Sequence, residues 1–287
     1  MSGGASSRAK GQPRPLTDHE LDDVTAQAWL GDLRPNVYVF VSIFTYLMCN
    51  ADLSEVSVIG FRWAWGRQRM SPWSSDKYWT SSGRGDGVVN GGTGQIADKL
   101  GEILGSNAQT SSKVVRAAPT ATGWIVTVDA GGETQQVECN QIVSALPAPI
   151  VLDVLSDLPD WKRAALSSVR YGQYVVAPIV VSAPDTECPP LEVVPFRREI
   201  GTNWIYARPY QMSPAPLDRS FGFFTSIATD ADARRIWADD DESIKSGVAN
   251  VFTTLYPQLA DRILYVGLKR WKHGLPQLRP GSMNRMA

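Results

Sequence analysis

The N-terminal part of the chain has hydrophobic residues at the spacing of helices. Thr17 and Glu20 have the S/T-x-x-E spacing of a capping box, in which both side chains accept hydrogen bonds from backbone N–H groups at a helix start. We therefore expect a helix over residues 18–30, ended by Gly31. A second helix is expected over residues 36–50. Because it is apolar on almost all sides it should be buried, with an interfacial segment at a lipid surface as the alternative.

The pattern changes at residue 88, where a short apolar run leads into glycines at 91–94. An amphipathic helix should follow over residues 95–104 and be closed by Gly105. Glycines before a helix can present backbone N–H groups to a phosphate or carboxylate, or they can simply allow the turn that starts the helix. Both interpretations are open from the sequence alone. The apolar positions of this helix are Ile96, Leu100, Ile103 and Leu104.

Runs rich in β-branched residues come next. Residues 113–117, 124–128 and 134–137 predict three strands, and the glycine-containing turn at 129–132 predicts a hairpin between the last two. A fourth apolar run, residues 141–146, stops at Pro147 and is expected to be a strand as well.

The second half of the chain alternates helices and strands. Asp160 is expected to cap a helix, and Pro178 should place its strand at an edge or a bulge, because proline has no N–H to donate. The carboxylates of residues 230–242 predict a solvated turn. Helices are expected over residues 148–155, 160–166 and 243–255, and strands over residues 171–182, 203–206, 221–227 and 263–268.

The composition is that of a folded protein with little net charge. The chain has 287 residues, of which 43% are hydrophobic and 20% charged, and 28 basic residues nearly balance 29 acidic ones. This balance argues against a protein that neutralises a nucleic-acid backbone, so no nucleic-acid partner is expected. Residues 61–84 interleave aromatic side chains with cations. Such a segment can stack on single-stranded bases, lie at a lipid headgroup boundary, or pack its aromatic rings on the core, which is the interpretation we favour.

Cysteine usage and the chain start indicate a cytoplasmic protein, with peripheral membrane contact as an option. Cys49, Cys139 and Cys188 are far apart in the sequence, and they predict neither a zinc site nor a disulfide framework. Residues 1–16 lack the apolar core of a signal peptide and predict a disordered tail. The longest apolar run, residues 37–49, is shorter than the roughly 20 residues of a membrane-spanning helix.

Familiar catalytic motifs such as G-x-S-x-G, a Walker loop and H-E-x-x-H do not occur in the sequence. The order of four segments carries more information, because together they resemble the flavin-dependent amine oxidase superfamily, which includes protoporphyrinogen oxidases and phytoene-desaturase-like enzymes. The segments are GGTGQIADKLGEIL (91–104), VVRAAPTATGWIVTVDAGG (114–132), VECNQIVSALPAPIVLDVL (137–155) and RWKHGLPQLRPG (270–281).

The resemblance implies an FAD cofactor and a set of residues close to it. In the family, the strand that corresponds to Val114 and Val115 lies against the adenine, and the segment that corresponds to Ala145, Leu146 and Pro147 passes close to the dinucleotide. A strand can satisfy the edge of adenine with its backbone, and small residues permit close approach. Trp271 lies in the last matching segment and is the sixth candidate for cofactor binding. The alternative is that Val114 and Ala145 are ordinary sheet core.

Two parts of the family pattern are missing from this sequence. No strand with a G-x-G-x-x-G turn precedes residue 20, and the chain stops soon after residue 281, where a C-terminal FAD motif should begin. The resemblance therefore implies an α+β (α/β) fold with a mixed β-sheet substrate domain, helices and a partial FAD-binding domain. Its parts would be a disordered tail (1–16), the helical part of the substrate domain (17–87), the partial FAD-binding domain (88–156), the substrate domain with the mixed sheet (157–270) and the start of a truncated C-terminal FAD segment (271–287).

The implied activity is oxidation of a bulky apolar or amine-type small molecule by hydride transfer to FAD. Many amine oxidases of the family carry a lysine near the flavin on the strand that corresponds to residues 171–182, where this chain has Val176 and no lysine. Apolar or porphyrin-like substrates are therefore favoured over amines, and no catalytic residue is predicted. Arg270 and Lys272 beside Trp271 either steer an acidic substrate or are simply solvated. The alternative function is a non-catalytic subunit that binds an apolar ligand or a partner chain, which would supply the missing FAD-binding parts.

Overall fold

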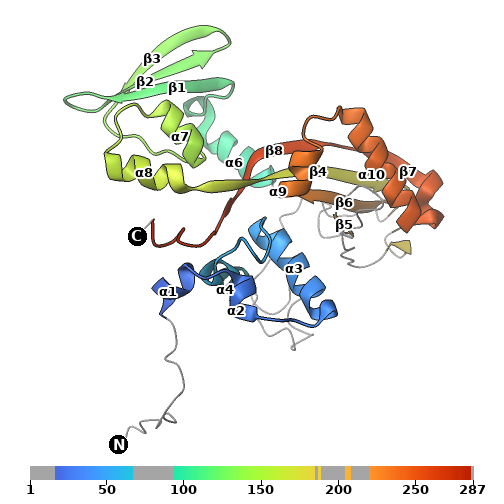
Figure 1. Ribbon diagram of the computed structural model, residues 1–287. Helices are drawn as coiled ribbons and strands as arrows, with labels where there is room; N and C mark the ends of the chain where they lie inside the picture. Colours follow the sequence, from blue (N-terminus) through green and yellow to red (C-terminus); the bar gives the residue numbers. More distant parts are fainter. Residues whose placement is uncertain (1–16, 67–93, 185–186, 189–203, 208–219, 286–287) are drawn as a thin grey trace, which may run out of the picture.

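The computed structural model describes residues 17–66, 94–184, 187–188, 204–207 and 220–285, which form two antiparallel sheets with helices packed around them. Figure 1 shows the small sheet beside α7 and α8, the large sheet beside α9 and α10, and the N-terminal helices below both. The α+β class expected from the sequence is confirmed. Most of the segment 61–84, the tail 1–16, and Gly91 and Gly92 of the glycine cluster lie outside the described residues.

The predicted first helix is wrong in one respect, because it consists of two short helices. α1 (Asp18–Asp22) has the expected capping box between Thr17 and Glu20. α2 (Ala26–Leu30) begins at a second cap, where Thr25 Oγ1 accepts a hydrogen bond from the Ala28 N–H at 3.2 Å. The backbone leaves the helix to form this cap, and Gly31 at φ +65° ends α2 as predicted.

α3 (Pro35–Cys49) and α4 (Val58–Gly66) complete the N-terminal helices. The C-terminal half of α3 is buried against Leu53 and Val56, with Cys49 in the same cluster. The expectation that all of α3 is buried is wrong for its first turns. There Val37, Tyr38, Val39 and Phe40 are 37–54% exposed.

The small sheet has the order β1-β2-β3 and follows an amphipathic helix. α6 (Gly94–Leu104) passes into η2 (Gly105–Asn107), and β1 (Ser112–Pro119), β2 (Trp124–Ala130) and β3 (Glu133–Cys139) form the predicted hairpin meander. The expected fourth strand at 141–146 does not form, because no described strand lies beside it to pair with its backbone.

Two helices follow the small sheet. α7 (Ala148–Val154) packs against β1, and α8 (Asp160–Ser168) packs against α7. Asp160 is the first residue of α8 and not its cap, which is Pro159.

The large sheet has β4 (Arg170–Val181) at its centre. It pairs with β6 (Gly222–Thr229) on one side and with both β7 (Ile263–Val266) and β8 (Lys269–Gln277) on the other, while β5 (Trp204–Ala207) pairs with β6. Of the two positions expected from Pro178, an edge or a bulge, the edge is wrong, because β4 lies at the centre of the sheet. This proline lies between the segments of β4 that pair with β7 and β8, where its carbonyl accepts a hydrogen bond from the Gly267 N–H at 2.8 Å.

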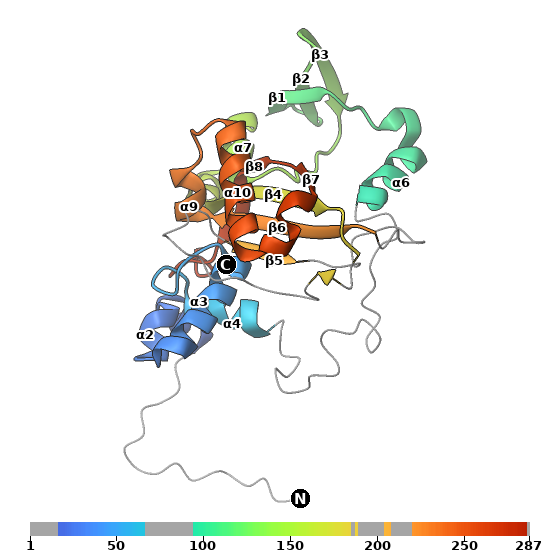
Figure 2. The same cartoon turned by 90° about the vertical axis from the view of Figure 1, so that its right-hand side faces the viewer.

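Helices α9 (Asp230–Arg235) and α10 (Asp241–Leu255) and the turn η5 (Pro257–Arg262) accompany this sheet. Figure 2 shows α10 lying over it. The main core packs Ile179 of β4 and Phe224 of β6 against Phe252 of α10, and the two phenyl rings meet at 4.8 Å. The solvated turn expected over 230–242 is therefore wrong in part, since α9 forms there with Asp230 buried.

The sequence pattern missed β8, because residues 269–277 are mostly polar and contain a proline. This strand pairs with residues 170–176 of β4 and leads back to the N-terminal helices, where the Ser57 N–H donates to the Leu278 carbonyl at 2.8 Å. In the part of the chain that the structure describes, no helix has the length and apolar character needed to cross a bilayer.

Candidate functional site

Three of the six predicted cofactor-binding residues line one apolar pocket of about 520 Å³, called here the apolar pocket. Val114 enters it from β1, and Ala145 and Leu146 enter it from the segment that precedes α7. The pocket thus lies between a strand edge, an extended segment and a helix. Its other lining residues are Ser112, Lys113, Ala117, Val126, Ile142, Val143, Ser144, Ile150, Val151, Val154 and Leu155.

The backbone around this pocket has hydrogen-bonding capacity that the small sheet does not use. The β1–β2 register passes from Val114 directly to Arg116, so Val115 is the extra residue of a bulge, and its side chain is 40% exposed. Residues 141–146 belong to no strand. Backbone outside a strand ladder, beside small residues such as Ser144, fits a planar heteroaromatic ring with polar edges, as adenine is.

Val115 and the remaining two predicted residues do not line this pocket. Pro147 forms the N-cap of α7 immediately after the lining segment. Trp271 lies in β8 of the large sheet, opposite Tyr174, with 51% of its surface exposed and the Lys269 ammonium 5.4 Å from its ring centre. Lys269 is also the cross-strand neighbour of Val176, so a lysine does lie on this sheet next to the position where β4 has none.

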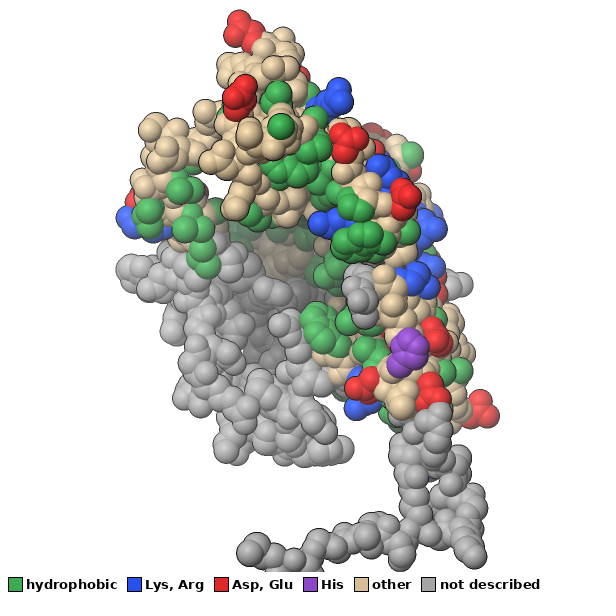
Figure 3. Space-filling model, turned by 90° about the vertical axis from the view of Figure 1, so that its left-hand side faces the viewer, with side chains coloured by type: hydrophobic (Ala, Val, Ile, Leu, Met, Phe, Trp, Pro, Cys, Tyr) green, Lys and Arg blue, Asp and Glu red, His purple; other side chains and the backbone are tan. Residues whose placement is uncertain are grey.

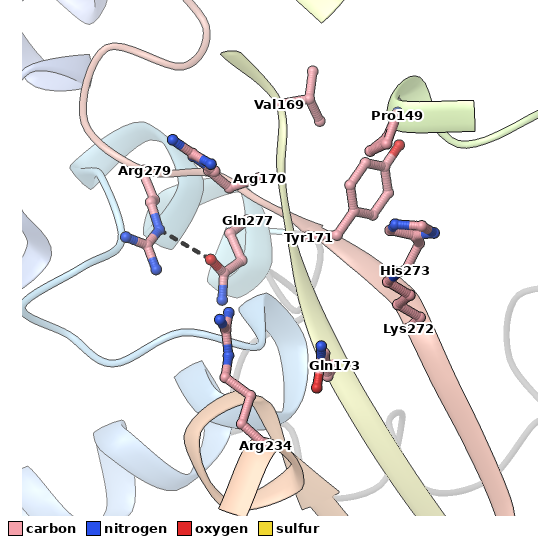
Figure 4. A pocket seen from close by; sticks show the side chains of 10 residues that line it. All are labelled: Pro149, Val169, Arg170, Tyr171, Gln173, Arg234, Lys272, His273, Gln277 and Arg279. Atoms are coloured by element: carbon pink, nitrogen blue, oxygen red, sulfur yellow. Dashed lines mark hydrogen bonds between the residues drawn. The ribbon is translucent and has the colours of Figure 1, made fainter. Parts of the chain in front are cut away.

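A second cavity, of about 430 Å³, is lined by cations and is called here the basic pocket (Figure 4). It lies at the end of β4 and β8 near the start of α7. Its lining includes no carboxylate. The lining residues are Pro149, Val169, Arg170, Tyr171, Gln173, Arg234, Lys272, His273, Gln277 and Arg279.

A local irregularity of β8 brings Lys272 and His273 to this pocket together. The register passes from Gly172 opposite Leu275 to Tyr174 opposite Trp271, so the three residues of β8 between them bulge beside Gln173. Gly274 permits this bulge, because a Cβ there would collide with the Tyr174 ring. Consecutive residues that would point to opposite faces of a regular strand therefore both line the pocket.

An aromatic pair and an amide complete one side of the basic pocket. The rings of Tyr171 and His273 meet edge to face at 5.4 Å, and the Tyr171 hydroxyl accepts a hydrogen bond from the Ala148 N–H at 3.1 Å. Oε1 of Gln173 is buried and has no hydrogen-bond partner within the described residues. This oxygen, or the amide nitrogen if the group is turned over, is available to a ligand.

The other side of the pocket is fixed by ion pairs. Arg234 donates to Asp230 at 2.7 and 3.0 Å. Arg279 donates from Nε to Gln277 at 2.9 Å, drawn in Figure 4, and from Nη2 to Glu55 at 3.0 Å. These contacts hold two guanidinium groups at the rim without filling the cavity.

Only part of this second site is predictable from the sequence. Lys272 is one of the two cations beside Trp271 for which an acidic substrate is an option, and it does line the basic pocket. Arg270 does not, because it is paired with Asp241 and with the Asp239 carbonyl. Arg170, Arg234 and Arg279 lie up to 109 residues apart, so no local spacing in the sequence could have predicted that they share a pocket. The one local feature is the sequence R-Y-G at 170–172, which lies at the start of a predicted strand.

The apolar pocket and the basic pocket lie on opposite sides of the first turn of α7. Pro149 faces the basic pocket, whereas the next two residues, Ile150 and Val151, face the apolar pocket. Figure 3 shows the molecule from the side of the small sheet, where hydrophobic side chains border a hollow. The arrangement can hold an apolar or aromatic group in one cavity and a charged group in the other.

Comparisons with known proteins agree with the resemblance. The family model described as flavin-containing amine oxidoreductase matches residues 13–281. No curated protein matches the sequence. Among solved structures, a double mutant of putrescine oxidase is 15% identical with a TM-score of 0.67 over 92% of this chain and 59% of its own. Cyclohexylamine oxidase from Brevibacterium oxydans IH-35A is 14% identical with a TM-score of 0.62 over 92% of this chain and 58% of its own. The chain thus spans less than two thirds of these proteins, and at this identity the likeness shows the fold alone.

Proposed function

Since the chain belongs to the flavin-containing amine oxidoreductase family, we propose that it forms part of an FAD-dependent oxidoreductase acting on a small molecule. The observation that supports this most is the apolar pocket, where Val114, Ala145 and Leu146 meet although 31 residues separate the first two. The alternative interpretation, that Val114 and Ala145 are ordinary sheet core, is less favoured because both residues border an open cavity. Flavin, when bound, supplies the hydride acceptor, and the protein supplies binding and orientation.

The residues of the apolar pocket suit the adenosine end of the cofactor. Val114, Val126 and Ile150 offer apolar surface to an aromatic ring, and the bulge at Val115 offers unpaired backbone groups to its edge. The small side chain of Ala145 takes up little space in the wall of the apolar pocket. Groups for the pyrophosphate and most of the flavin would come from polypeptide beyond the residues described, in the same protein or in a partner chain.

Titration with FAD, followed by quenching of flavin fluorescence, tests this assignment. We expect ADP to compete with FAD and riboflavin not to compete, because riboflavin lacks the adenosine end. Ala145→Phe should weaken FAD binding about tenfold or more by filling the pocket, roughly the loss of 1.4 kcal/mol or more. Ala108→Phe, at an exposed position, is the matched control. FAD binding that ADP does not displace, or that Ala145→Phe leaves intact, would contradict the assignment.

A second candidate function is supported by exposed apolar surface on the small sheet's side of the molecule. All four apolar residues of α6 are 49–72% exposed, and Val143 is 97% exposed. Surfaces of this kind commonly mark sites of protein association. We therefore keep the alternative of a subunit that binds a partner chain without itself completing a catalytic site. A folded chain that binds neither FAD nor ADP and forms a stable complex with another polypeptide would favour it.

We also propose a cytoplasmic location, supported by three cysteines that are all free thiols.

Peripheral contact with a membrane is supported by the exposed first turns of α3 and by two tryptophans nearby in the sequence. Trp29 and Trp63 are 48% and 47% exposed. Sedimentation with vesicles of anionic phospholipid tests this contact, and Phe40→Glu should abolish it.

A further inference from the structure

We propose that the basic pocket binds the carboxylate of a small-molecule ligand. That this ligand is the substrate to be oxidised rests on the proposed function, whereas the anion site itself does not. The proposal follows from the charge, the hydrogen-bonding groups and the position of the pocket.

The lining of the pocket keeps a positive charge after the ion pairs of its cations are counted. Arg234 is neutralised by Asp230, and Arg279 by Glu55. Arg170 and Lys272 form no ion pair with any other described residue. Two unpaired cations therefore line one cavity whose lining holds no carboxylate, and a bound anion would be attracted by both charges.

The hydrogen-bonding groups fit an oxyanion. A guanidinium group presents N–H donors in a planar fork that matches the two oxygens of a carboxylate, and Lys272 adds an ammonium from the bulge of β8. Figure 4 shows Arg170, Gln277 and Arg279 close together on one side of β4, with Tyr171, His273 and Lys272 grouped on the other. The Tyr171–His273 pair offers an aromatic edge to the body of the ligand.

The position of the pocket distinguishes a ligand carboxylate from a cofactor phosphate. The apolar pocket, to which we assign the adenosine end of FAD, lies across α7 and shares no lining residue with the basic pocket. Both anions have oxygens that the same cations would bind, so the experiment must include each of them.

Calorimetric titration of the full chain without flavin tests the proposal. The probes are benzoate, its charge-reversed counterpart benzylamine, and inorganic pyrophosphate. We expect benzoate to bind, benzylamine not to bind, and pyrophosphate to bind more weakly than benzoate. Arg170→Gln and Lys272→Gln should each weaken benzoate about tenfold, as expected for the loss of one charge-assisted hydrogen bond. Both side chains are exposed, so neither change should disturb folding.

Lys162→Gln on α8 is the control, because it removes an exposed cation outside the pocket. It should leave benzoate binding unchanged, and all three variants should keep the wild-type affinity for FAD. Benzylamine binding, or benzoate binding unaffected by Arg170→Gln and Lys272→Gln, would overturn the proposal. Stronger binding of pyrophosphate, lost in the same two variants together with FAD affinity, would also overturn it and assign the pocket to the cofactor. Failure of the chain to bind FAD would contradict the proposed function while leaving the benzoate result intact.

Discussion

Gln277 at the end of β8 donates a hydrogen bond from Nε2 to the backbone carbonyl of Asn50, 2.6 Å away at the end of α3. Both residues are buried, with 3% and 0% of their surfaces exposed. Because Oε1 of Gln277 also accepts from Arg279, one amide connects the N-terminal helices, the large sheet and the rim of the basic pocket.

Replacing this amide should destabilise the protein. In Gln277→Met the carbonyl of Asn50 loses this donor and Arg279 keeps only its ion pair with Glu55, at similar side-chain volume, so we expect the free energy of unfolding to fall by about 1–3 kcal/mol. Urea denaturation followed by circular dichroism measures the change. Gln135→Met, at an exposed position of β3, should change stability by less than about 0.5 kcal/mol. Equal effects of the two substitutions would contradict this account.

Gly172 is predicted to be intolerant of any side chain. A Cβ at this position would collide with the Asn50 side chain, whose Nδ2 donates to the Gln173 carbonyl at 3.2 Å. Gly172→Ala should therefore lower the free energy of unfolding by about 1–3 kcal/mol. Combining it with Asn50→Gly should restore part of the loss, because it removes the side chain that the new Cβ would meet. Glycine is tolerated at position 50, where φ is +50°.

A double-mutant cycle in urea measures this coupling, which should be favourable by about 0.5 kcal/mol or more. Gly101→Ala in α6 is the matched control, because the space around it is open and alanine favours a helix. Additive effects of Gly172→Ala and Asn50→Gly would show that the collision is not the cause.

The sequence predicted correctly those elements that are determined by a few neighbouring residues. The capping box of Thr17, the glycine end of α2 and the hairpin between β2 and β3 depend on a few neighbouring residues, and all are present in the structure. The family resemblance, which uses the order of elements, is confirmed by the match over residues 13–281.

The features that the sequence could not predict depend on distant contacts. β8 is a strand because β4 pairs with it, although its own residues are polar, and residues 141–146 are not a strand although they are apolar, because no described strand pairs with them. The basic pocket could not be predicted from the sequence for the same reason. Its cations come from β4, α9, β8 and the segment after β8, and only the folded chain places them around one cavity.

The exposed apolar face of α6 should contribute to association and not to stability. Leu100 and Ile103 are 54% and 72% exposed, so Leu100→Glu combined with Ile103→Glu removes little buried area. We expect the free energy of unfolding to change by less than about 1 kcal/mol and any self-association or binding of a partner chain to decrease. Analytical ultracentrifugation and urea denaturation measure the two effects. A strongly destabilised variant would show instead that this face is packed within the chain.

The protein should lose stability in alkaline solution through a buried thiol and a half-buried phenol. Burial raises the pKa of Cys49 from an ordinary value of 9.0 to about 12, and burial together with nearby carboxylates, Asp52 first among them, raises the pKa of Tyr46 from 10.0 to about 12. A raised pKa means that the unfolded chain releases the proton at a lower pH than the folded protein. These groups therefore favour the folded state fully below pH 9, and this contribution is lost as the pH rises from about 9 to about 12.

Urea denaturation at half-unit steps between pH 8 and pH 11 measures this loss, and each group contributes a slope of at most about 1.4 kcal/mol per pH unit. Cys49→Ala should lower the free energy of unfolding at pH 8, because it leaves a small cavity and removes the weak Sγ contact to the Gly60 carbonyl at 3.9 Å. It should also reduce the slope of the free energy of unfolding against pH above pH 9, by the contribution of one titrating group. Identical slopes in the wild-type protein and Cys49→Ala would mean that another group is responsible for the alkaline transition.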